Sequence, residues 1–236
     1  LLKLETQHFI AVLNDKASQT NDDRKKVLFK SMIAMINYMD ERTLDKQFYF
    51  GTDNFEYVWQ SMIDKVFGIR NKDDYFPNAS WRERHGSKKG VVKRPLEPDS
   101  IMVCGDKFYV LDAKFYKYGS TANVDDLPNS ADINKQITYG DYIKSHEKKA
   151  GKGLFNAFLM PFSMNKNYFG ITQKWLGNVS EAVGNWRQLP FKDFEKIEGI
   201  VVDVRYLMYH LEGNHDKEKQ MLAEEIESGV NEFIYQ

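Results

Sequence analysis

The sequence predicts an α/β domain in which a mixed β-sheet is flanked by helices, with a hairpin of residues 99–114 at the centre of the sheet and a helical element at the N-terminus. A hairpin signal at residues 99–114 and two short apolar runs at 156–162 and 199–208 support this fold class. A chain of 236 residues is long enough for one sizeable domain with an appended element. We therefore expect a helical extension at 1–46 and a main domain at 47–236.

The N-terminal extension is rich in good helix formers. Polar residues at 18–23 supply a loop and a helix cap ahead of an apolar helical segment. We expect a helical hairpin that packs on the main domain. Binding of a partner or clamping of DNA is the alternative role for this element.

A second helix is expected from residue 55, because apolar residues recur there at helical spacing: Phe55, Val58, Trp59, Met62, Ile63 and Val66. Asp53 is a suitable N-cap and Gly68 a suitable end point. Glu56 lies three residues after Asp53, where a glutamate commonly completes a capping box.

The hairpin signal consists of a Gly105-Asp106 pair between two apolar runs, as in tight two-residue turns. Such a turn fixes the register of the two strands, so that Cys104 faces Lys107. Continued along the strands, the same register places Asp99 opposite Asp112.

Alternation of side chains along a strand puts Asp112 and Lys114 on one face, and Asp99 joins them as a cross-strand neighbour. Like charges so close repel each other unless a cation lies between them. Two carboxylates suit Mg²⁺, which also binds substrate phosphate. The pattern therefore predicts metal-assisted phosphodiester hydrolysis, with Lys114 supplying positive charge. A solvent-facing hairpin with ordinary acids at its edge is the alternative.

A basic loop precedes Asp99. Residues 82–94 hold six basic side chains and one acid, and they include two glycines. Basic side chains near a nucleic acid backbone release counterions and steer the duplex. The loop is thus the best candidate for phosphate contact, through Arg82, Arg84, Lys88, Lys89, Lys93 and Arg94. The alternative is that this segment is an ordinary solvent-exposed surface, which is the more common case for a run of charged residues.

The second half of the chain supplies further elements. Helix-type sequence runs from Asp132 to Lys149, and an amphipathic helix is expected at 216–233. The apolar runs at 156–162 and 199–208 are typical of buried strands. An insertion rich in Trp, Asn and Lys is expected between these runs, and core packing is a more frequent outcome for its aromatic residues than base stacking.

Composition limits the function classes. The net charge is only −1, so contact with DNA must come from local patches. A single cysteine excludes an intramolecular disulfide and a cysteine-cluster zinc site. The sequence contains no signal peptide, no apolar run that approaches a membrane span and no phosphate-cradling glycine loop. We expect a cytoplasmic protein that does not act at a membrane.

These residues carry a resemblance. Pro98-Asp99 followed by Asp112-Ala113-Lys114 resembles the PD-(D/E)XK nuclease motif. More narrowly, three segments are similar to the LlaJI-like restriction endonucleases, which are related to the nuclease subunit of McrBC-type systems: KRPLEPDSIMV, FYVLDAKFYKYG and LPNSADINKQITYGDYI. The similarity covers residues 50–145 well and the remainder loosely.

The resemblance implies a restriction-endonuclease-like core in the main domain and Mg²⁺-dependent cleavage of DNA, with Mn²⁺ as a possible substitute. Asp99, Asp112 and Glu56 would bind the metal, and Lys114 would orient and activate the water. Gln136 resembles the glutamine that completes the family's site. The family often carries a Tyr four positions after this Gln, whereas here Tyr139 is three positions after it and Gly140 is four.

The resemblance also implies partners. Double-stranded DNA would be the substrate, a GTP-hydrolysing motor of the McrB type would assist, and a dimer would cut both strands. Two alternatives remain: a repair or recombination nuclease that prefers branched or single-stranded DNA, and a non-catalytic DNA-binding assembly subunit. The complete Asp99, Asp112 and Lys114 set speaks against the second.

Overall fold

The structure is a computed structural model. It describes residues 2–40, 54–82, 91–93, 95–146, 153–172, 174–184 and 193–232. The chain forms two compact units, Leu1–Gly51 and Thr52–Gln236, which are described separately.

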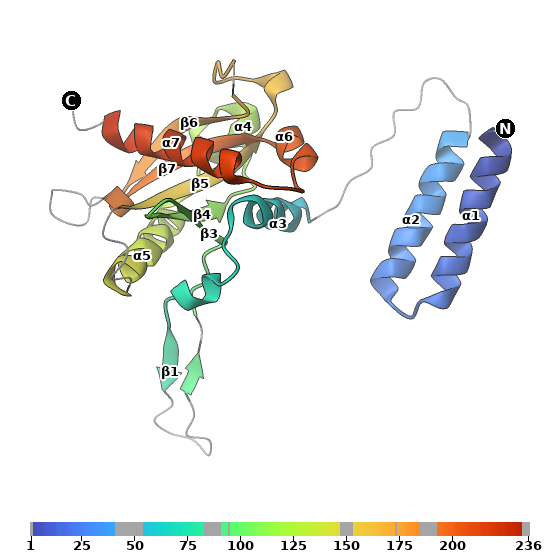
Figure 1. The fold of residues 1–236 in the computed structure, drawn as a ribbon, viewed down its shortest axis with the longest axis horizontal. Helices are drawn as coiled ribbons and strands as arrows, with labels where there is room; N and C mark the ends of the chain where they lie inside the picture. The colour runs from blue at the N-terminus through green and yellow to red at the C-terminus, as the bar shows by residue number, and fades with distance from the viewer. Residues whose placement is uncertain are drawn as a thin grey trace. The chain divides into compact units, whose positions relative to one another are not determined.

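The first unit is a pair of helices, α1 (Leu2–Gln19) and α2 (Asp23–Asp40), which pack against each other (Figure 1). A short polar turn joins them, in which Thr20 accepts a hydrogen bond from the Asp22 backbone. The expected helical element and its loop are thus confirmed.

The second unit is built on a five-stranded mixed sheet in the order β3-β4-β5-β7-β6. Its strands are β3 (Ser100–Cys104), β4 (Lys107–Ala113), β5 (Leu154–Phe162), β6 (Leu176–Val183) and β7 (Lys196–Asp203). β4, β5 and β7 run parallel, whereas β3 and β6 are antiparallel to their neighbours. The hairpin was expected at the centre of the sheet, but it forms one edge, and the wholly buried β5 lies at the centre.

The predicted hairpin register is confirmed. Cys104 pairs with Lys107, and the ladder continues to the pairing of Ser100 with Leu111. Gly105 adopts a φ of +62°, which glycine tolerates without strain. The turn therefore determines which residues stand beside each other at the far end of the hairpin.

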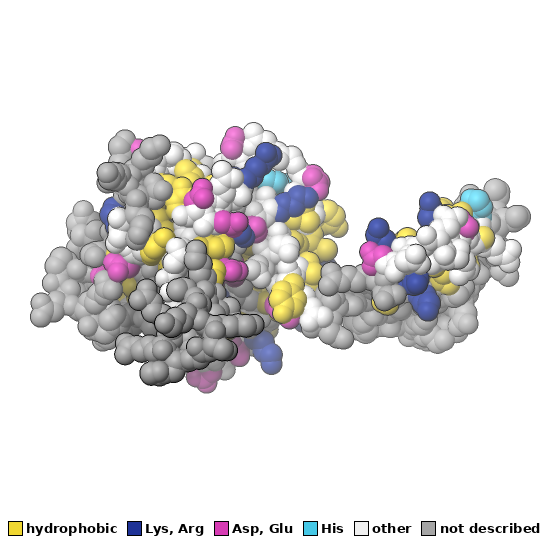
Figure 2. Space-filling view, turned by 90° about the horizontal axis from the view of Figure 1, so that it is seen from below, with side chains coloured by type: hydrophobic (Ala, Val, Ile, Leu, Met, Phe, Trp, Pro, Cys, Tyr) yellow, Lys and Arg dark blue, Asp and Glu magenta, His cyan; other side chains and the backbone are white. Residues whose placement is uncertain are grey.

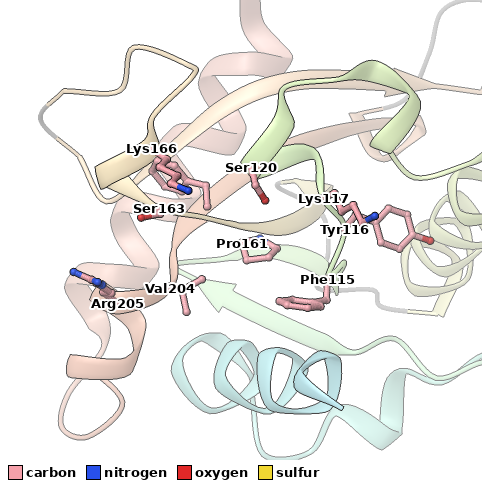
Figure 3. A pocket seen from close by; sticks show the side chains of 11 residues that line it. Phe115, Tyr116, Lys117, Ser120, Pro161, Ser163, Lys166, Val204 and Arg205 are labelled. Atoms are coloured by element: carbon pink, nitrogen blue, oxygen red, sulfur yellow. The ribbon is translucent and has the colours of Figure 1, made fainter. Parts of the chain in front are cut away.

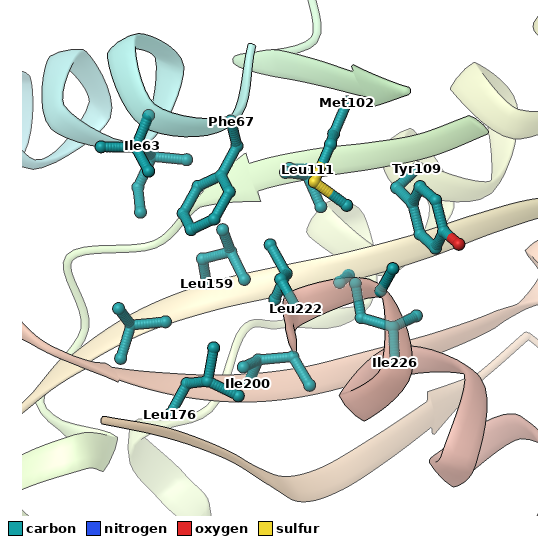
Figure 4. Packing of buried hydrophobic residues seen from close by; sticks show 14 of the residues in the cluster. Ile63, Phe67, Met102, Tyr109, Leu111, Leu159, Leu176, Ile200, Leu222 and Ile226 are labelled. Carbon is teal, nitrogen blue, oxygen red and sulfur yellow. The ribbon is translucent and has the colours of Figure 1, made fainter. Parts of the chain in front are cut away.

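Helices cover both faces of the sheet (Figure 1). α3 (Phe55–Phe67) and α7 (Asp216–Glu232) pack on one face, and α5 (Ser130–His146) packs on the other. Figure 4 shows the first of these interfaces, where side chains of α3 and α7 meet those of the strands: Ile63, Phe67, Leu222 and Ile226 against Met102, Tyr109, Leu111, Leu159, Leu176 and Ile200.

Four expectations about elements need correction. The apolar run 199–208 is a strand only as far as Asp203, whose side chain caps the following helix α6 (Val204–Tyr209) by accepting a 2.7 Å hydrogen bond from Tyr206 N–H. The segment between the two apolar runs was expected as an insertion, but it contains strand β6. Asn54, not Asp53, is the N-cap of α3, so Glu56 does not hold the capping-box position. α5 begins at Ser130 rather than near Asp132.

The basic segment 82–94, expected as a loop, is partly a two-stranded arm. β1 (Ser80–Arg82) pairs antiparallel with β2 (Val91–Lys93), and the arm extends away from the main sheet (Figure 1). The remaining helical turns are α4 (Tyr118–Thr121), η1 (Lys72–Tyr75), η2 (Val124–Asp126), η3 (Met164–Lys166) and η4 (Asp193–Glu195). Within the described ranges, every helix is too short or too polar to span a bilayer.

Candidate active site

Two carboxylates lie close together at the open end of the β3–β4 hairpin, away from its turn. Asp112 lies near the end of β4 and is only 2 % exposed, and Asp99 directly precedes β3. Oδ2 of Asp99 accepts a 2.9 Å hydrogen bond from the backbone N–H of Ala113, which ties the start of one strand to the end of the other. The structure thus brings the two predicted acids together through the register of the hairpin.

This proximity changes the acidity of Asp99. Burial of the side chain, and then the negative charge of Asp112, raise the pKa of Asp99 to about 6. The Ala113 N–H and the positive charges of Lys135 and Lys114 act in the opposite direction but do not cancel the rise. A carboxylate held against a like charge in this way is well suited to bind a cation.

Lys114 stands between two carboxylates. Its Nζ lies 2.7 Å from Oδ2 of Asp112 and 2.6 Å from Oδ1 of Asp132, and its side chain is 13 % exposed. Burial alone would lower the pKa of the Lys114 ammonium group, but the two carboxylates outweigh it and raise the pKa above its ordinary value. Lys114 is therefore a fixed positive charge at neutral pH rather than a proton acceptor.

Asp132 is a residue of this site that the sequence analysis did not select. Its carboxylate accepts a hydrogen bond from the Asn129 backbone N–H (3.2 Å), while Oδ1 of Asn129 accepts one from the Asp132 N–H (3.2 Å). The pair is a reciprocal capping box at the start of α5. Burial would raise the pKa of Asp132, yet the hydrogen bond and charge of Lys114 hold it below its ordinary value.

A local sequence signal for Asp132 did exist. An Asn followed three residues later by an Asp, directly before a helical pattern, is the residue spacing of a capping box. The signal predicts where the carboxylate sits on the helix. The contact with Lys114 depends on how α5 packs against β4.

Helix α3 contributes an amide to the site. Nε2 of Gln60 donates a 2.8 Å hydrogen bond to Oδ1 of Asp99. The helix is anchored one residue earlier, where the fully buried Trp59 donates its indole N–H to the Leu159 carbonyl (3.0 Å). Loss of a buried Trp side chain costs about 3–5 kcal/mol, so this anchor holds Gln60 in place.

Glu56 lies on α3 one turn before Gln60 and is exposed. Within the described part of the chain it forms no hydrogen bond or ion pair. Its role as a metal ligand stays a prediction.

The backbone around Asp99 is held from two sides. Nζ of Lys72 donates to the Asp99 carbonyl (2.7 Å) and pairs with Oδ2 of Asp64 (2.9 Å). The hydroxyl of the buried Tyr139 donates to the Glu97 carbonyl (3.0 Å). Tyr139 thus acts on the segment that leads into Asp99.

Gln136 is buried, and its side-chain amide contacts the sheet, while its role in the site stays a prediction. Its Nε2 donates to the Val110 carbonyl (2.7 Å) and lies 3.4 Å from Oδ1 of Asn156. No hydrogen bond in the described ranges joins Gln136 to Asp99 or Asp112. The amide nitrogen therefore fastens α5 to the sheet.

The position four residues after Gln136 cannot hold a large side chain. A Cβ at Gly140 would lie 2.9 Å from Phe194 and 3.0 Å from the Asn156 amide. This crowding leaves no room for a tyrosine at position 140, whereas the buried Tyr139 lies one residue earlier.

The predicted phosphate-binding residues can be placed only in part. Arg82 ends β1 opposite Val91, and Lys93 ends β2 opposite Ser80, so the two residues lie at opposite ends of the paired strands. Arg84, Lys88, Lys89 and Arg94 lie outside the described residues.

The donor set fits a hard divalent cation. Oδ2 of Asp112 is buried, and although it is close to Lys114 Nζ, the two are not aligned as a hydrogen bond. This oxygen keeps a lone pair for another ligand. Among the described residues, no group of three or more His, Cys, Asp or Glu side chains is arranged to hold a metal ion. Two carboxylates with open positions for water are the usual surroundings of protein-bound Mg²⁺.

The chain was compared with models of known protein families. The family model of the LlaJI restriction endonucleases matches residues 1–179 of the chain. The matched region includes every residue of the site described above, from Gln60 to Asp132. No curated protein matches the chain.

Proposed function

The chain belongs to the LlaJI restriction endonuclease family, and we propose on that basis that it hydrolyses DNA phosphodiester bonds with a divalent cation bound by Asp99 and Asp112. The family identifies a nuclease of a restriction system that acts on DNA. The observation that supports the specific proposal is the pair of carboxylates, Asp99 and Asp112, beside the ammonium group of Lys114.

Asp99 and Asp112 would hold the ion, with Mg²⁺ as the natural choice and Mn²⁺ as a substitute. When bound, such an ion polarises a phosphoryl oxygen and lowers the pKa of a bound water. Gln60 and the Ala113 N–H orient Asp99 for this task. The raised pKa of Asp99 supports the assignment, because bringing a cation to the pair removes the repulsion that disfavours its charge.

Lys114 supplies the second positive charge. Its raised pKa keeps the ammonium group protonated, so it orients the attacking water and stabilises negative charge that develops on the phosphate. Asp132 holds this ammonium group in place from α5. A cation that is already held in position needs little reorganisation during the reaction.

The β1–β2 arm is proposed to contact the DNA backbone. Acidic side chains lie among basic ones on the face shown in Figure 2, and the net charge is −1, so the field of the whole protein offers no strong attraction. The arm combines the basic segment with Trp81, which is 77 % exposed and can pack on a nucleotide. Replacement of Lys88, Lys89 and Lys93 by Ala should reduce the slope of log affinity against log salt concentration by about three.

Two partners follow from this function as proposals. Cleavage of both strands requires two active sites, so a dimer on DNA is expected. Among the residues of this sequence there is no phosphate-cradling glycine loop, which favours a separate GTP-hydrolysing motor of the McrB type.

The test is a cleavage assay on duplex DNA with Mg²⁺, Mn²⁺ or chelator, with and without the motor protein and GTP. Wild-type protein should cut only with metal, and Asp112→Asn should be inactive while its circular dichroism spectrum stays unchanged. Asp125→Asn, an exposed acid of η2, is the matched control and should cut normally. Cleavage by Asp112→Asn at the wild-type rate would exclude the proposed metal site, and a preference for branched substrates would indicate a repair nuclease.

A further inference from the structure

A pocket opens directly beyond β4, at the residues that follow Lys114. Its volume is about 390 Å³, within the range of about 300–1,000 Å³ found for small-molecule sites. Phe115 and Lys117, the first and third residues after Lys114, line it together with the end of β5 and the start of α6. The pocket therefore lies at the same edge of the sheet as Asp112 and Lys114, because β4 and β5 run parallel.

The walls of the pocket are mainly apolar. Phe115 is 43 % exposed, and with Pro161 and Val204 it forms the apolar surface, as Figure 3 shows. The hydroxyl-bearing side chain of Ser120 approaches Pro161 from the side of α4. Flat apolar side chains of this kind suit the face of an aromatic ring.

The pocket is also preformed. A Cβ at Gly119 would lie 2.0 Å from the Pro161 carbonyl oxygen, so α4 approaches β5 as closely as the backbone allows. Tyr118 beside it is buried and contacts Phe169, with ring centroids 5.4 Å apart. The wall is therefore fixed by packing before any ligand arrives.

The rim of the pocket carries positive charge. Lys117, Lys166 and Arg205 are exposed, and within the described ranges none of them forms an ion pair. No acidic side chain lines the pocket among the residues that the structure describes. An apolar pocket with only cations at its rim is complementary to an aromatic ring that carries phosphate groups.

We propose that this pocket receives one nucleotide of the substrate DNA, with its base turned out of the duplex against Phe115 and Pro161 and its flanking phosphates against Lys117 and Arg205. The inference rests on the proposed function, because the neighbouring Lys114 defines where the cleaved phosphate lies. A base within the helical stack could not reach a walled pocket, so the nucleotide must leave the stack. The protein would thereby read one base close to the cut.

The test uses the full chain and duplexes that contain the mapped cleavage site. 2-Aminopurine, whose fluorescence rises when it leaves the base stack, replaces one base at a time near the cut. Binding is measured in chelator, so that no cleavage occurs. Wild-type protein should give a severalfold rise at one position and none at the others.

Ser120→Leu, which fills the pocket, should abolish that rise. Ser228→Leu, an exposed serine on α7, is the matched control and should preserve it. DNA that lacks the base at the responsive position should bind wild-type protein and Ser120→Leu equally well. Replacing both Lys117 and Arg205 by Ala should reduce the salt slope by about two.

Each outcome supports or contradicts the proposed nucleotide pocket. DNA that is bound and cut without any fluorescence rise, or a rise that survives Ser120→Leu, overturns the pocket while leaving the metal site intact. A fluorescence rise at one base of a duplex that Asp112→Asn cuts at the wild-type rate supports the pocket and overturns the proposed metal site. Absence of DNA binding overturns both.

Discussion

Oδ1 of Asp132 lies 2.6 Å from Nζ of Lys114, although the two residues come from different elements. Asp132 is itself fixed by the capping box with Asn129, so the start of α5 sets the position of the ammonium group. The relationship makes a helix cap part of the proposed active site.

Asp132→Asn should therefore lower the cleavage rate by about 10- to 100-fold, a usual effect of removing a group that orients a site residue. DNA affinity should change little. Single-turnover rates at saturating protein measure the first effect, and binding in chelator measures the second. An unchanged cleavage rate would show that Asp132 acts only on the fold.

Lys114→Ala should reduce the single-turnover rate at saturating protein by about 10²–10³-fold, since it removes a charge that stabilises the transition state. Its affinity for DNA in chelator should stay close to that of wild type. Lys217→Ala, an exposed lysine on α7, is the control. Normal cleavage by Lys114→Ala would reassign the lysine to a structural role.

Asp99→Asn should stabilise the metal-free protein at pH 7.5. The pKa of Asp99 is about 6 in the folded protein and 3.8 in the absence of shifts, so the folded state holds its proton more tightly. The favourable contribution of the protonated group is complete below about pH 4 and is lost as the pH rises through about 6. Asparagine carries no charge, so the variant does not lose this stability as the pH rises. The difference in stability between the variant and the wild-type protein should be smaller at pH 5.

Thermal unfolding at the two pH values checks this prediction. Added Mg²⁺ should also narrow the difference at pH 7.5, because the ion stabilises only the wild-type pair. A variant less stable than wild type at pH 7.5 would contradict the repulsion between Asp99 and Asp112.

Gln60→Ala should raise the Mg²⁺ concentration required for half-maximal cleavage, because Asp99 loses the donor that orients it. Glu56→Gln tests the exposed carboxylate one turn earlier on the same helix. If Glu56 is a ligand of the ion, this change should raise the Mg²⁺ requirement as well. An unchanged requirement removes Glu56 from the site.

The parts of the fold that depend on local patterns were predictable. A two-residue turn has few geometries, so Gly105-Asp106 determined the register that brings Asp99 to Asp112. The apolar periodicity of α3 likewise located the helix, although its cap is Asn54 rather than Asp53.

The parts that depend on packing between distant segments were not predictable. The order of strands in the sheet sets the hairpin at an edge, and no local pattern encodes that order. The apolar run 199–208 changes from strand to helix at Asp203, because the side chain of this residue caps α6. Gln60 and Asp132 became visible only once α3 and α5 were placed on the sheet.

The order of strands has a consequence for synthesis. β7 is inserted between β5 and β6, yet it follows both in the chain. During synthesis, the ribosome thus adds Gln60, Asp99, Lys114 and Asp132 to the chain well before the sheet that supports them is complete. We expect the nuclease to stay inactive until residues 196–203 have left the ribosome, which protects the host's DNA from an unfinished enzyme.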